Sequence, residues 1–288
     1  MKPILLLAIF VLQALPASIQ VHGHRGARAV RPENTLPAFE YAIEAGVDAI
    51  EMDLAVTKDD VIVSSHDPVL NPDICSGPGA PRPIRTMMLS ELRQWDCGAK
   101  KNPKYPKQQP VPGARIPTLD EVLALAPRGR FEFNIETKIF KEHPEYTPSP
   151  EKFARLVLDA VRRHKLESRV ILQSFDYRTL LAMKKLEPKI RLSALYEDGP
   201  ADWVELARSA QADIISPQKH LVTPERVAAA HAAGLQVIPW TANEPEAWDK
   251  LIAAGVDAII TDDPRELIRH LERRVLRPVI DGPARSGR

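Results

Sequence analysis

Short runs of β-branched and other apolar residues alternate along the chain with longer segments whose apolar residues recur every three or four positions. Eight runs read as strands: Val21–His24, Ala49–Val56, Arg130–Glu136, Val170–Phe175, Ile190–Tyr196, Asp213–Ser216, Gln236–Trp240 and Asp257–Thr261. Eight segments between and after them read as helices: Thr35–Ala45, Leu119–Ala126, Pro150–His164, Tyr177–Leu186, Ala201–Ser209, Pro224–Ala233, Pro245–Ala254 and Pro264–Leu276. Strands that alternate with helices form parallel sheets, and eight such units predict an α/β fold of the TIM (β/α)8 barrel type.

One segment interrupts this alternation after the second strand. Residues 68–117 are rich in proline, glycine and lysine, and they are too numerous for an ordinary loop between a strand and a helix. We therefore predict an insertion over one rim of the barrel. Within it, Leu89, Leu92 and Trp95 have helical spacing and predict a short helix, which we interpret as a lid that shapes the substrate entrance.

The first residues differ in composition from the rest of the chain. Lys2 is followed by an apolar run from Ile4 to Leu12 and by small residues up to Ala17. This pattern predicts a signal peptide over residues 1–17 and a secreted or periplasmic protein, with a single barrel domain over 18–288. The run is shorter than the roughly 20 residues of a membrane span, so we expect no stable membrane insertion. A buried first helix that plugs the barrel is the alternative.

The two cysteines and the net charge indicate which disulfide, metal site and macromolecular partner we can expect. Cys75 and Cys97 are the only two cysteines and flank one segment of the insertion, so in an exported protein they could form a disulfide, with two unpaired thiols as the alternative. Neither has His or Cys neighbours at the spacing of a zinc site. A formal net charge of +1 gives no reason to expect nucleic acid as a partner.

Ionisable residues of several kinds gather within the first quarter of the chain. His24-Arg25, Glu33, Glu51, Asp53 and His66-Asp67 all lie within 44 residues. Histidines exchange protons near neutral pH, arginine grips phosphate through two hydrogen bonds, and carboxylates hold hard divalent cations. The combination indicates a site that breaks phosphate esters.

The predicted strands would bring these groups together with others from later in the chain, because catalytic groups of a TIM barrel lie at the carboxyl ends of its strands. Glu51 and Asp53 are two residues apart, so both side chains point to one side of the second strand. Glu136 would enter from the adjacent strand as a third ligand. Three carboxylates without a soft ligand favour Mg²⁺ or Ca²⁺ over zinc. Lys138, Gln173 and Trp240 follow at or near the ends of later strands, and we assign them to substrate binding, with core packing as the alternative for Trp240.

The order of the motifs resembles the glycerophosphodiester phosphodiesterase family, whose members are TIM barrels. From His22 to Asp67 the chain contains H-G-H-R-G-A, P-E-N-T, G-V-D-A-I-E-M-D, T-K-D and H-D. Further matches are N-I-E-T-K at 134–138, Q-S-F at 173–175, W-T at 240–241 and T-D at 261–262.

The resemblance implies hydrolysis of a small-molecule glycerophosphodiester to sn-glycerol 3-phosphate and an alcohol. It implies that His24 and His66 are the general acid/base pair, that Arg25 binds the phosphate and that the divalent metal is held by Glu51, Asp53 and Glu136. It also places Glu33 in the active site, although Glu33-Asn34 has the alternative role of starting a helix. Which histidine is the acid stays open.

Two other functions remain alternatives at this point. A relative of phospholipase D type, acting on lysophospholipids or sphingolipids, would share the two histidines and the acidic metal site. It would need an apolar surface, for which the sequence offers only five residues of the insertion: Met87, Met88, Leu89, Leu92 and Trp95. A non-catalytic binding protein could use the same barrel, because a fold alone does not imply a function.

Overall fold

The structure, a computed structural model, describes residues 18–274, 276 and 277. The predicted signal peptide lies outside the described residues. Within the described part, no helix is both long enough and apolar enough to cross a membrane.

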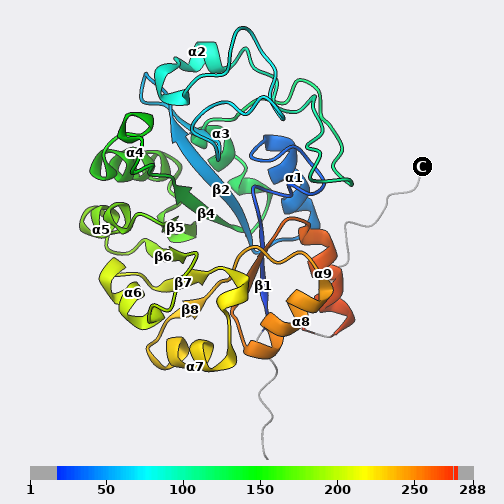
Figure 1. Cartoon of the computed structure of the whole chain (residues 1–288), viewed down its shortest axis with the longest axis vertical. Helices are drawn as coiled ribbons and strands as arrows, with labels where there is room; N and C mark the ends of the chain where they lie inside the picture. Colours follow the sequence, from blue (N-terminus) through cyan, green and yellow to red (C-terminus); the bar gives the residue numbers. More distant parts are fainter. Residues whose placement is uncertain (1–17, 275, 278–288) are drawn as a thin grey trace, which may run out of the picture.

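Parallel strands form a barrel at the centre of the molecule (Figure 1). Hydrogen-bonded neighbours follow the order β8-β7-β6-β5-β4-β2-β1-β9. These strands are β1 (Gln20–Gly23), β2 (Ala49–Val56), β4 (Glu132–Thr137), β5 (Val170–Ser174), β6 (Arg191–Tyr196), β7 (Ile214–Pro217), β8 (Gln236–Val237) and β9 (Ala258–Thr261). Backbone N–H groups of Asp257 and Ile260 donate to the carbonyls of Val237 and Pro239, which joins β9 to the β8 segment. The predicted TIM barrel is confirmed.

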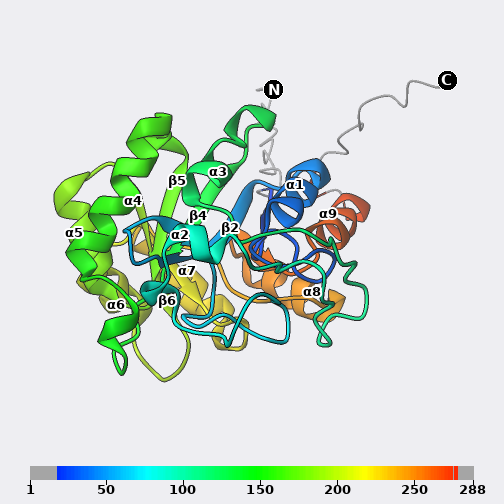
Figure 2. The same ribbon diagram turned by 90° about the horizontal axis from the view of Figure 1, so that it is seen from above.

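Helices surround the strands, as Figures 1 and 2 show from two directions. They are α1 (Leu36–Ala45), α3 (Leu119–Leu123), α4 (Pro150–His164), α5 (Tyr177–Leu186), α6 (Trp203–Ala210), α7 (Pro224–Ala232), α8 (Pro245–Ala254) and α9 (Pro264–Arg273). Side-chain oxygens of Thr223 and Asp263 accept hydrogen bonds from the first turns of α7 and α9, and a proline follows each of them. These caps define where the two helices begin.

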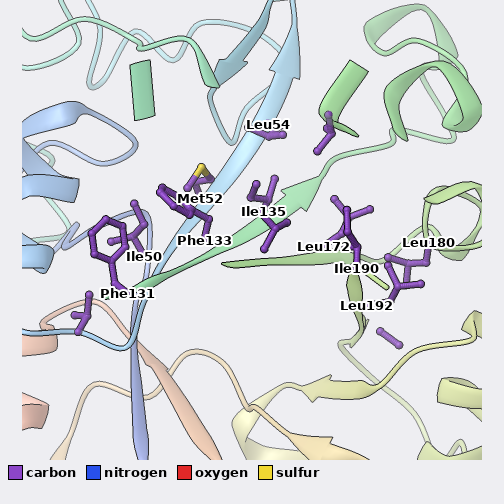
Figure 3. Packing of buried hydrophobic residues seen from close by; sticks show 14 of the residues in the cluster. Ile50, Met52, Leu54, Phe131, Phe133, Ile135, Leu172, Leu180, Ile190 and Leu192 are labelled. Atoms are coloured by element: carbon purple, nitrogen blue, oxygen red, sulfur yellow. The ribbon is translucent and has the colours of Figure 1, made fainter. Parts of the chain in front are cut away.

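The main core fills the layer between the strands and the surrounding helices. Ile50, Met52 and Leu54 alternate along β2 on its outer side, and Phe133 and Ile135 continue this layer on β4 (Figure 3). All five side chains are fully buried, and burial of each stabilises the fold by about 1.5–3 kcal/mol. Because successive side chains of a strand point to opposite faces, this packing directs Glu51 and Asp53 on β2, and Glu136 next to Ile135 on β4, into the barrel.

Two strands differ from the prediction. The chain turns back after β2 and forms β3 (Ile62–Ser64), which pairs antiparallel with β2 and was not predicted because three residues carry little pattern. This return places His66 close to the end of β2. Strand β8 is only two residues long, because Pro239 lacks an N–H to donate, and Trp240 instead forms an isolated bridge with Gln218.

The insertion packs around a small core of its own, outside the ring of helices in Figure 1. Its only α-helix is α2 (Leu89–Leu92), shorter than the predicted segment, and it follows the 3-10 turn η1 (Ile84–Thr86). Cys75 and Cys97 form a disulfide. The buried residues of this cluster come from the insertion and the β2–β3 hairpin: Ala55, Val63, Leu70, Cys75, Ile84, Met87, Leu92, Trp95, Cys97 and Ile116.

We expect the disulfide to stabilise the insertion, because it closes a loop between residues 22 positions apart. In the chain-entropy model a loop of this size contributes about 3 kcal/mol. A Cys75→Ser/Cys97→Ser double variant should therefore unfold at a lower urea concentration in equilibrium denaturation. Wild-type protein kept under a reductant provides the control and should unfold together with the variant. Unchanged midpoints in both samples would contradict the prediction.

Candidate active site

A cavity of about 310 Å³ lies at the carboxyl ends of the barrel strands. Nine of the ten predicted site residues line it: His24, Arg25, Glu51, Asp53, His66, Glu136, Lys138, Gln173 and Trp240. The tenth, Glu33, accepts a hydrogen bond of 2.6 Å from the guanidinium of Arg25. The structure thus brings residues from six strands and their following loops into one place.

Three carboxylates form the base of the cavity. Glu51 and Asp53 project from β2 and Glu136 from β4, where the Cα atoms of Asp53 and Glu136 are partners in the ladder. One oxygen from each lies within 4.8 Å of the other two, and the residues are 1%, 1% and 5% exposed. Charged oxygens this close repel one another and lose the solvation of water, which makes the cluster costly unless cations compensate it.

Two cations of the chain supply part of that compensation. The Lys138 ammonium lies 2.6 Å from Glu136 and 3.1 Å from Asp53, and the Nε atom of Arg25 lies 3.1 Å from Asp53. Burial opposes ionisation of Asp53, but Lys138 and Arg25 hold the pKa of that carboxyl well below its usual range. Burial and the charges of Asp53 and Glu136 raise the pKa of Glu51 well above its usual value. The positive charges of Lys138 and Arg25 are therefore not sufficient to stabilise the ionised form of all three carboxylates.

The cluster has the chemistry of a site for a hard divalent cation. It offers only oxygen donors, and these are close enough together to contact one ion. A bound cation would favour the ionised form of Glu51, which burial and the neighbouring carboxylates oppose. The residues present thus fit the metal that the sequence predicts.

Backbone geometry around Arg25 aims its groups at the cluster. Its N–H donates to the Glu51 carboxylate at 2.9 Å, and its φ angle of +48° is rare outside glycine. Gly26 follows with φ +81°, and a Cβ atom there would lie 2.6 Å from the carbonyl carbon of Ala38. Only glycine fits this close approach of the loop to α1, which accounts for the glycine directly after His24-Arg25.

Asn34 has a role that the sequence did not indicate. The alternative role from the sequence was a helix cap, but the N-cap of α1 is Thr35, and the Asn34 side chain holds Asp53. Its amide nitrogen donates to the Asp53 carboxylate at 2.9 Å, while its oxygen accepts from the Asp53 N–H at 3.3 Å and from the Ser64 hydroxyl at 2.9 Å. Asn34 thereby fixes the orientation of a predicted metal ligand.

Asp262, at the end of β9, is the second residue that sequence reasoning missed. Its carboxylate lies 2.6 Å from Nδ1 of His24 and accepts hydrogen bonds from Arg28 and Asn243. Burial has the largest influence on His24 and lowers its pKa to about 4, although the hydrogen bond and charge of Asp262 raise it. The sequence feature that could have indicated this role of Asp262 was the T-D pair at 261–262, because it lies at the carboxyl end of the last strand.

His66 has a similar arrangement in the loop after β3. Its Nδ1 atom lies 2.8 Å from the Asp67 carboxylate, which also accepts a hydrogen bond from Asn71 at 3.0 Å. Nδ1 of each histidine is thus hydrogen-bonded to a carboxylate, and Nε2 of each ring remains available to a molecule in the cavity. A carboxylate hydrogen-bonded to Nδ1 fixes the orientation and tautomer of an imidazole ring.

Gln173 and Trp240 line the cavity, and their polar groups form hydrogen bonds with other residues of the protein. The Gln173 amide donates one N–H to Glu51 at 2.9 Å and accepts from Asn134 at 3.1 Å, so it orients a carboxylate of the cluster. Its part in substrate binding stays a prediction. The Trp240 indole N–H donates to the Ser216 carbonyl at 2.9 Å, so Trp240 offers carbon atoms to the cavity.

The insertion contributes no lining residue to this cavity in the described part of the chain. It contacts the loop after β1 that carries Arg25: the Tyr105 ring lies 5.1 Å from the guanidinium of Arg28, and Gln108 donates to the Arg28 and Arg31 carbonyls. These contacts make the segment a support for the loop that carries Arg25, and its role as a lid stays a prediction.

The barrel and its cavity define a class of TIM-barrel enzymes in which histidines, an arginine and an acidic cluster meet at the carboxyl ends of the strands. The chain belongs to the glycerophosphoryl diester phosphodiesterase family, whose sequence profile matches residues 24–266. A relative named glycerophosphodiester phosphodiesterase, from Caldanaerobacter subterraneus subsp. tengcongensis, is 35% identical over 248 residues, which cover 86% of this chain and 96% of the relative. The protein is accordingly an enzyme of this family.

Solved structures agree with this assignment. A protein from Silicibacter pomeroyi with a provisional glycerophosphoryl diester phosphodiesterase name is 32% identical, with a TM-score of 0.85 over 90% of this chain and 95% of that one. A phosphodiesterase from Oleispira antarctica, in complex with the product sn-glycerol-3-phosphate, is 25% identical, with a TM-score of 0.75 over 88% and 96% of the two chains.

We expect divalent cations to stabilise the folded protein through the carboxylate cluster. A ligand that binds only the native state at about 100 times its dissociation constant stabilises by about 2.7 kcal/mol. Adding Ca²⁺ or Mg²⁺ to chelator-treated protein should raise its melting temperature, and Asp53→Asn should abolish that rise. Glu132→Gln is the matched control, since Glu132 is a carboxylate of β4 that pairs with Arg191 outside the cluster. An equal rise in Asp53→Asn and wild type would exclude the cluster as the binding site.

Proposed function

We propose that the protein hydrolyses glycerophosphodiesters to sn-glycerol 3-phosphate and an alcohol, using a divalent cation and two histidines. The observation that carries this proposal is the convergence of His24, His66, Arg25 and the three carboxylates on one cavity. The product bound to the Oleispira relative supports the glycerol phosphate part of the reaction.

The phosphate would lie between Arg25 and the carboxylate cluster. Glu51, Asp53 and Glu136 would hold Ca²⁺ or Mg²⁺, which when bound neutralises charge on the phosphoryl oxygens. Arg25 is held by Glu33 and Asp53, so its guanidinium is already oriented before substrate arrives. Lys138, anchored by Glu136 and Asp53, adds a second positive charge at the same position. Fixed charges of this kind stabilise a transition state without reorganisation.

The two histidines differ in a way that suggests their roles. His24 donates Nδ1–H to Asp262, and its pKa of about 4 keeps Nε2 unprotonated near neutral pH. We assign it as the base that takes a proton from the attacking hydroxyl, whether that hydroxyl belongs to water or to the glycerol of the substrate. His66, whose side chain is 37% exposed and paired with Asp67, is then the acid that protonates the leaving alcohol.

The surface of the insertion gives little support to the alternative reaction, the hydrolysis of lysophospholipids. Of the five apolar residues that the insertion offers for lipid contact, Met87, Leu92 and Trp95 belong to its buried cluster. Met88 is 40% exposed and stands alone there. An isolated exposed side chain is ordinary for a protein surface and does not indicate a lipid-binding face.

Metal removal tests the reaction itself. Exhaustive chelation should abolish the release of sn-glycerol 3-phosphate from glycerophosphocholine, and added Ca²⁺ or Mg²⁺ should restore it, because the carboxylates alone cannot neutralise the phosphoryl charge. An enzyme-coupled assay for sn-glycerol 3-phosphate measures both steps. Full turnover after verified metal removal would refute the cation's part in the proposal.

The histidine roles can be separated with an activated leaving group. His24→Ala and His66→Ala should each lower kcat by about 10²–10⁴-fold on glycerophosphocholine, the range for a lost proton transfer. A p-nitrophenyl diester of glycerol phosphate needs no acid for departure, so only His66→Ala should recover much of its rate on it. Recovery by His24→Ala alone would reverse the assignment, and recovery by neither would refute the two-histidine mechanism.

The pH dependence follows from the same assignment. A base with a lowered pKa is active where it is unprotonated, so the rate should fall as the pH drops through about 4, where His24 gains its proton. Asp262→Asn removes the hydrogen bond and charge that raise the pKa of His24, and it should shift this acid limb to lower pH. A pH–rate profile of both proteins measures the shift, and an upward shift would contradict it.

We further propose that the protein is exported, with a signal peptide over residues 1–17 and a secreted or periplasmic mature chain. The apolar run after Lys2 and the Cys75–Cys97 disulfide in the insertion support this proposal. Mass spectrometry of protein from the source cell should show a mature chain that begins near Ser18. Recovery of the chain with Met1 intact would contradict export by this route.

A further inference from the structure

The cavity has two chemically different walls. Strands β2 and β4 and the loops after β1, β3 and β4 supply the charged groups described above. The opposite wall comes from the ends of β5, β6 and the β8 segment, and its lining residues are Phe175, Leu195, Glu197 and Trp240. In the proposed reaction the charged wall takes the phosphate, so the second wall is available to the alcohol part of the substrate.

Two aromatic rings form most of that second wall. Phe175 and Trp240 contact each other edge to face, with their centroids 5.5 Å apart, and Phe175 is 40% exposed although it is a large apolar residue. The Trp240 indole is fixed by its hydrogen bond to the Ser216 carbonyl. The pair therefore presents fixed aromatic carbon surface to a ligand. Aromatic faces attract cations as well as apolar groups.

Phe175 already attracts one cation of the protein. The Lys138 ammonium lies 5.9 Å from the centroid of its ring. That ammonium is held on the other side by Glu136 and Asp53, so it belongs to the charged wall. Phe175 thus stands at the boundary between the phosphate position and the second wall.

Glu197 is the feature that the proposed reaction does not yet use. It is exposed and lines the cavity, and no hydrogen bond or ion pair engages its side chain among the described residues. A carboxylate beside a site for an anionic phosphodiester repels a substrate whose only charge is negative. It attracts a substrate that carries a positive charge at its other end.

We propose that Glu197, Phe175 and Trp240 form a subsite for a cationic head group, so that the enzyme prefers glycerophosphodiesters whose alcohol carries an ammonium group. This inference rests on the proposed function, since it concerns the alcohol side of the same cavity. The carboxylate attracts the charge and the rings contact the methylene or methyl groups around it. Both primary and quaternary ammonium groups fit this chemistry.

The experiment compares substrates that differ only in head-group charge. Values of kcat/KM are measured for glycerophosphocholine and glycerophosphoethanolamine, which have cationic head groups, and for glycerophosphoglycerol, which has a neutral one. Wild type should favour the cationic substrates by about 3- to 10-fold, the size of one exposed ion pair together with one cation–π contact. Glu197→Gln should remove most of this preference by lowering kcat/KM for the cationic substrates, with kcat/KM for glycerophosphoglycerol unchanged or raised.

Asp198→Asn is the matched control, because Asp198 is the neighbouring exposed acid, does not line the cavity and accepts a local hydrogen bond from the Gly199 N–H. It should keep the wild-type preference. Phe175→Leu, which retains an apolar side chain without the aromatic face, should weaken the preference as Glu197→Gln does.

The outcomes separate this inference from the proposed function. Equal kcat/KM for all three substrates in wild type would overturn the subsite while leaving the hydrolase intact. A uniform loss in Glu197→Gln, or the same loss in Asp198→Asn, would also overturn it. Failure to hydrolyse any of the three substrates with metal present would instead contradict the proposed function.

Discussion

Three carboxylates buried side by side at the mouth of the barrel are the constraint around which the site is built. Their oxygens lie within 4.8 Å of one another and are almost fully removed from water. Such an arrangement is costly without cations, and the neighbouring residues are those that reduce the cost: Lys138 and Arg25 bring charge, while Asn34 and Gln173 bring hydrogen bonds. Burial and the neighbouring carboxylates still raise the pKa of Glu51, so a divalent cation at the cluster would stabilise its ionised form.

The fold supplies the precision that this cluster requires. Ile50, Met52 and Leu54 anchor β2 in the outer core, and the alternation of the strand then fixes the directions of Glu51 and Asp53. Carboxylates also position the histidines, since Asp262 from the last strand holds His24 and Asp67 holds His66. Residues from the first and last strands can cooperate in this way because β1 and β9 are hydrogen-bonded neighbours in the barrel.

Sequence patterns predicted the alternating elements and the residues whose spacing carries chemistry, such as Glu51 and Asp53. They did not predict roles that depend on contacts between distant segments. Asn34 binds Asp53, Gln173 binds Glu51 and Asp262 binds His24 across 19, 122 and 238 positions, and each of these side chains has ordinary local alternatives. The lid interpretation stays a prediction for a related reason. Helical spacing indicates that Leu92 and Trp95 have a buried side, but it does not indicate what buries them.

The central claim is that the carboxylate cluster holds a divalent cation, and a crystal of the protein soaked in Mn²⁺ tests it most directly. Anomalous scattering locates Mn²⁺ without reference to activity. The account predicts one strong peak within coordination distance of Glu51, Asp53 and Glu136, with Arg25 and Lys138 nearby. A fully loaded crystal with no peak among these three carboxylates, or with its strong peak at another site, would contradict the account.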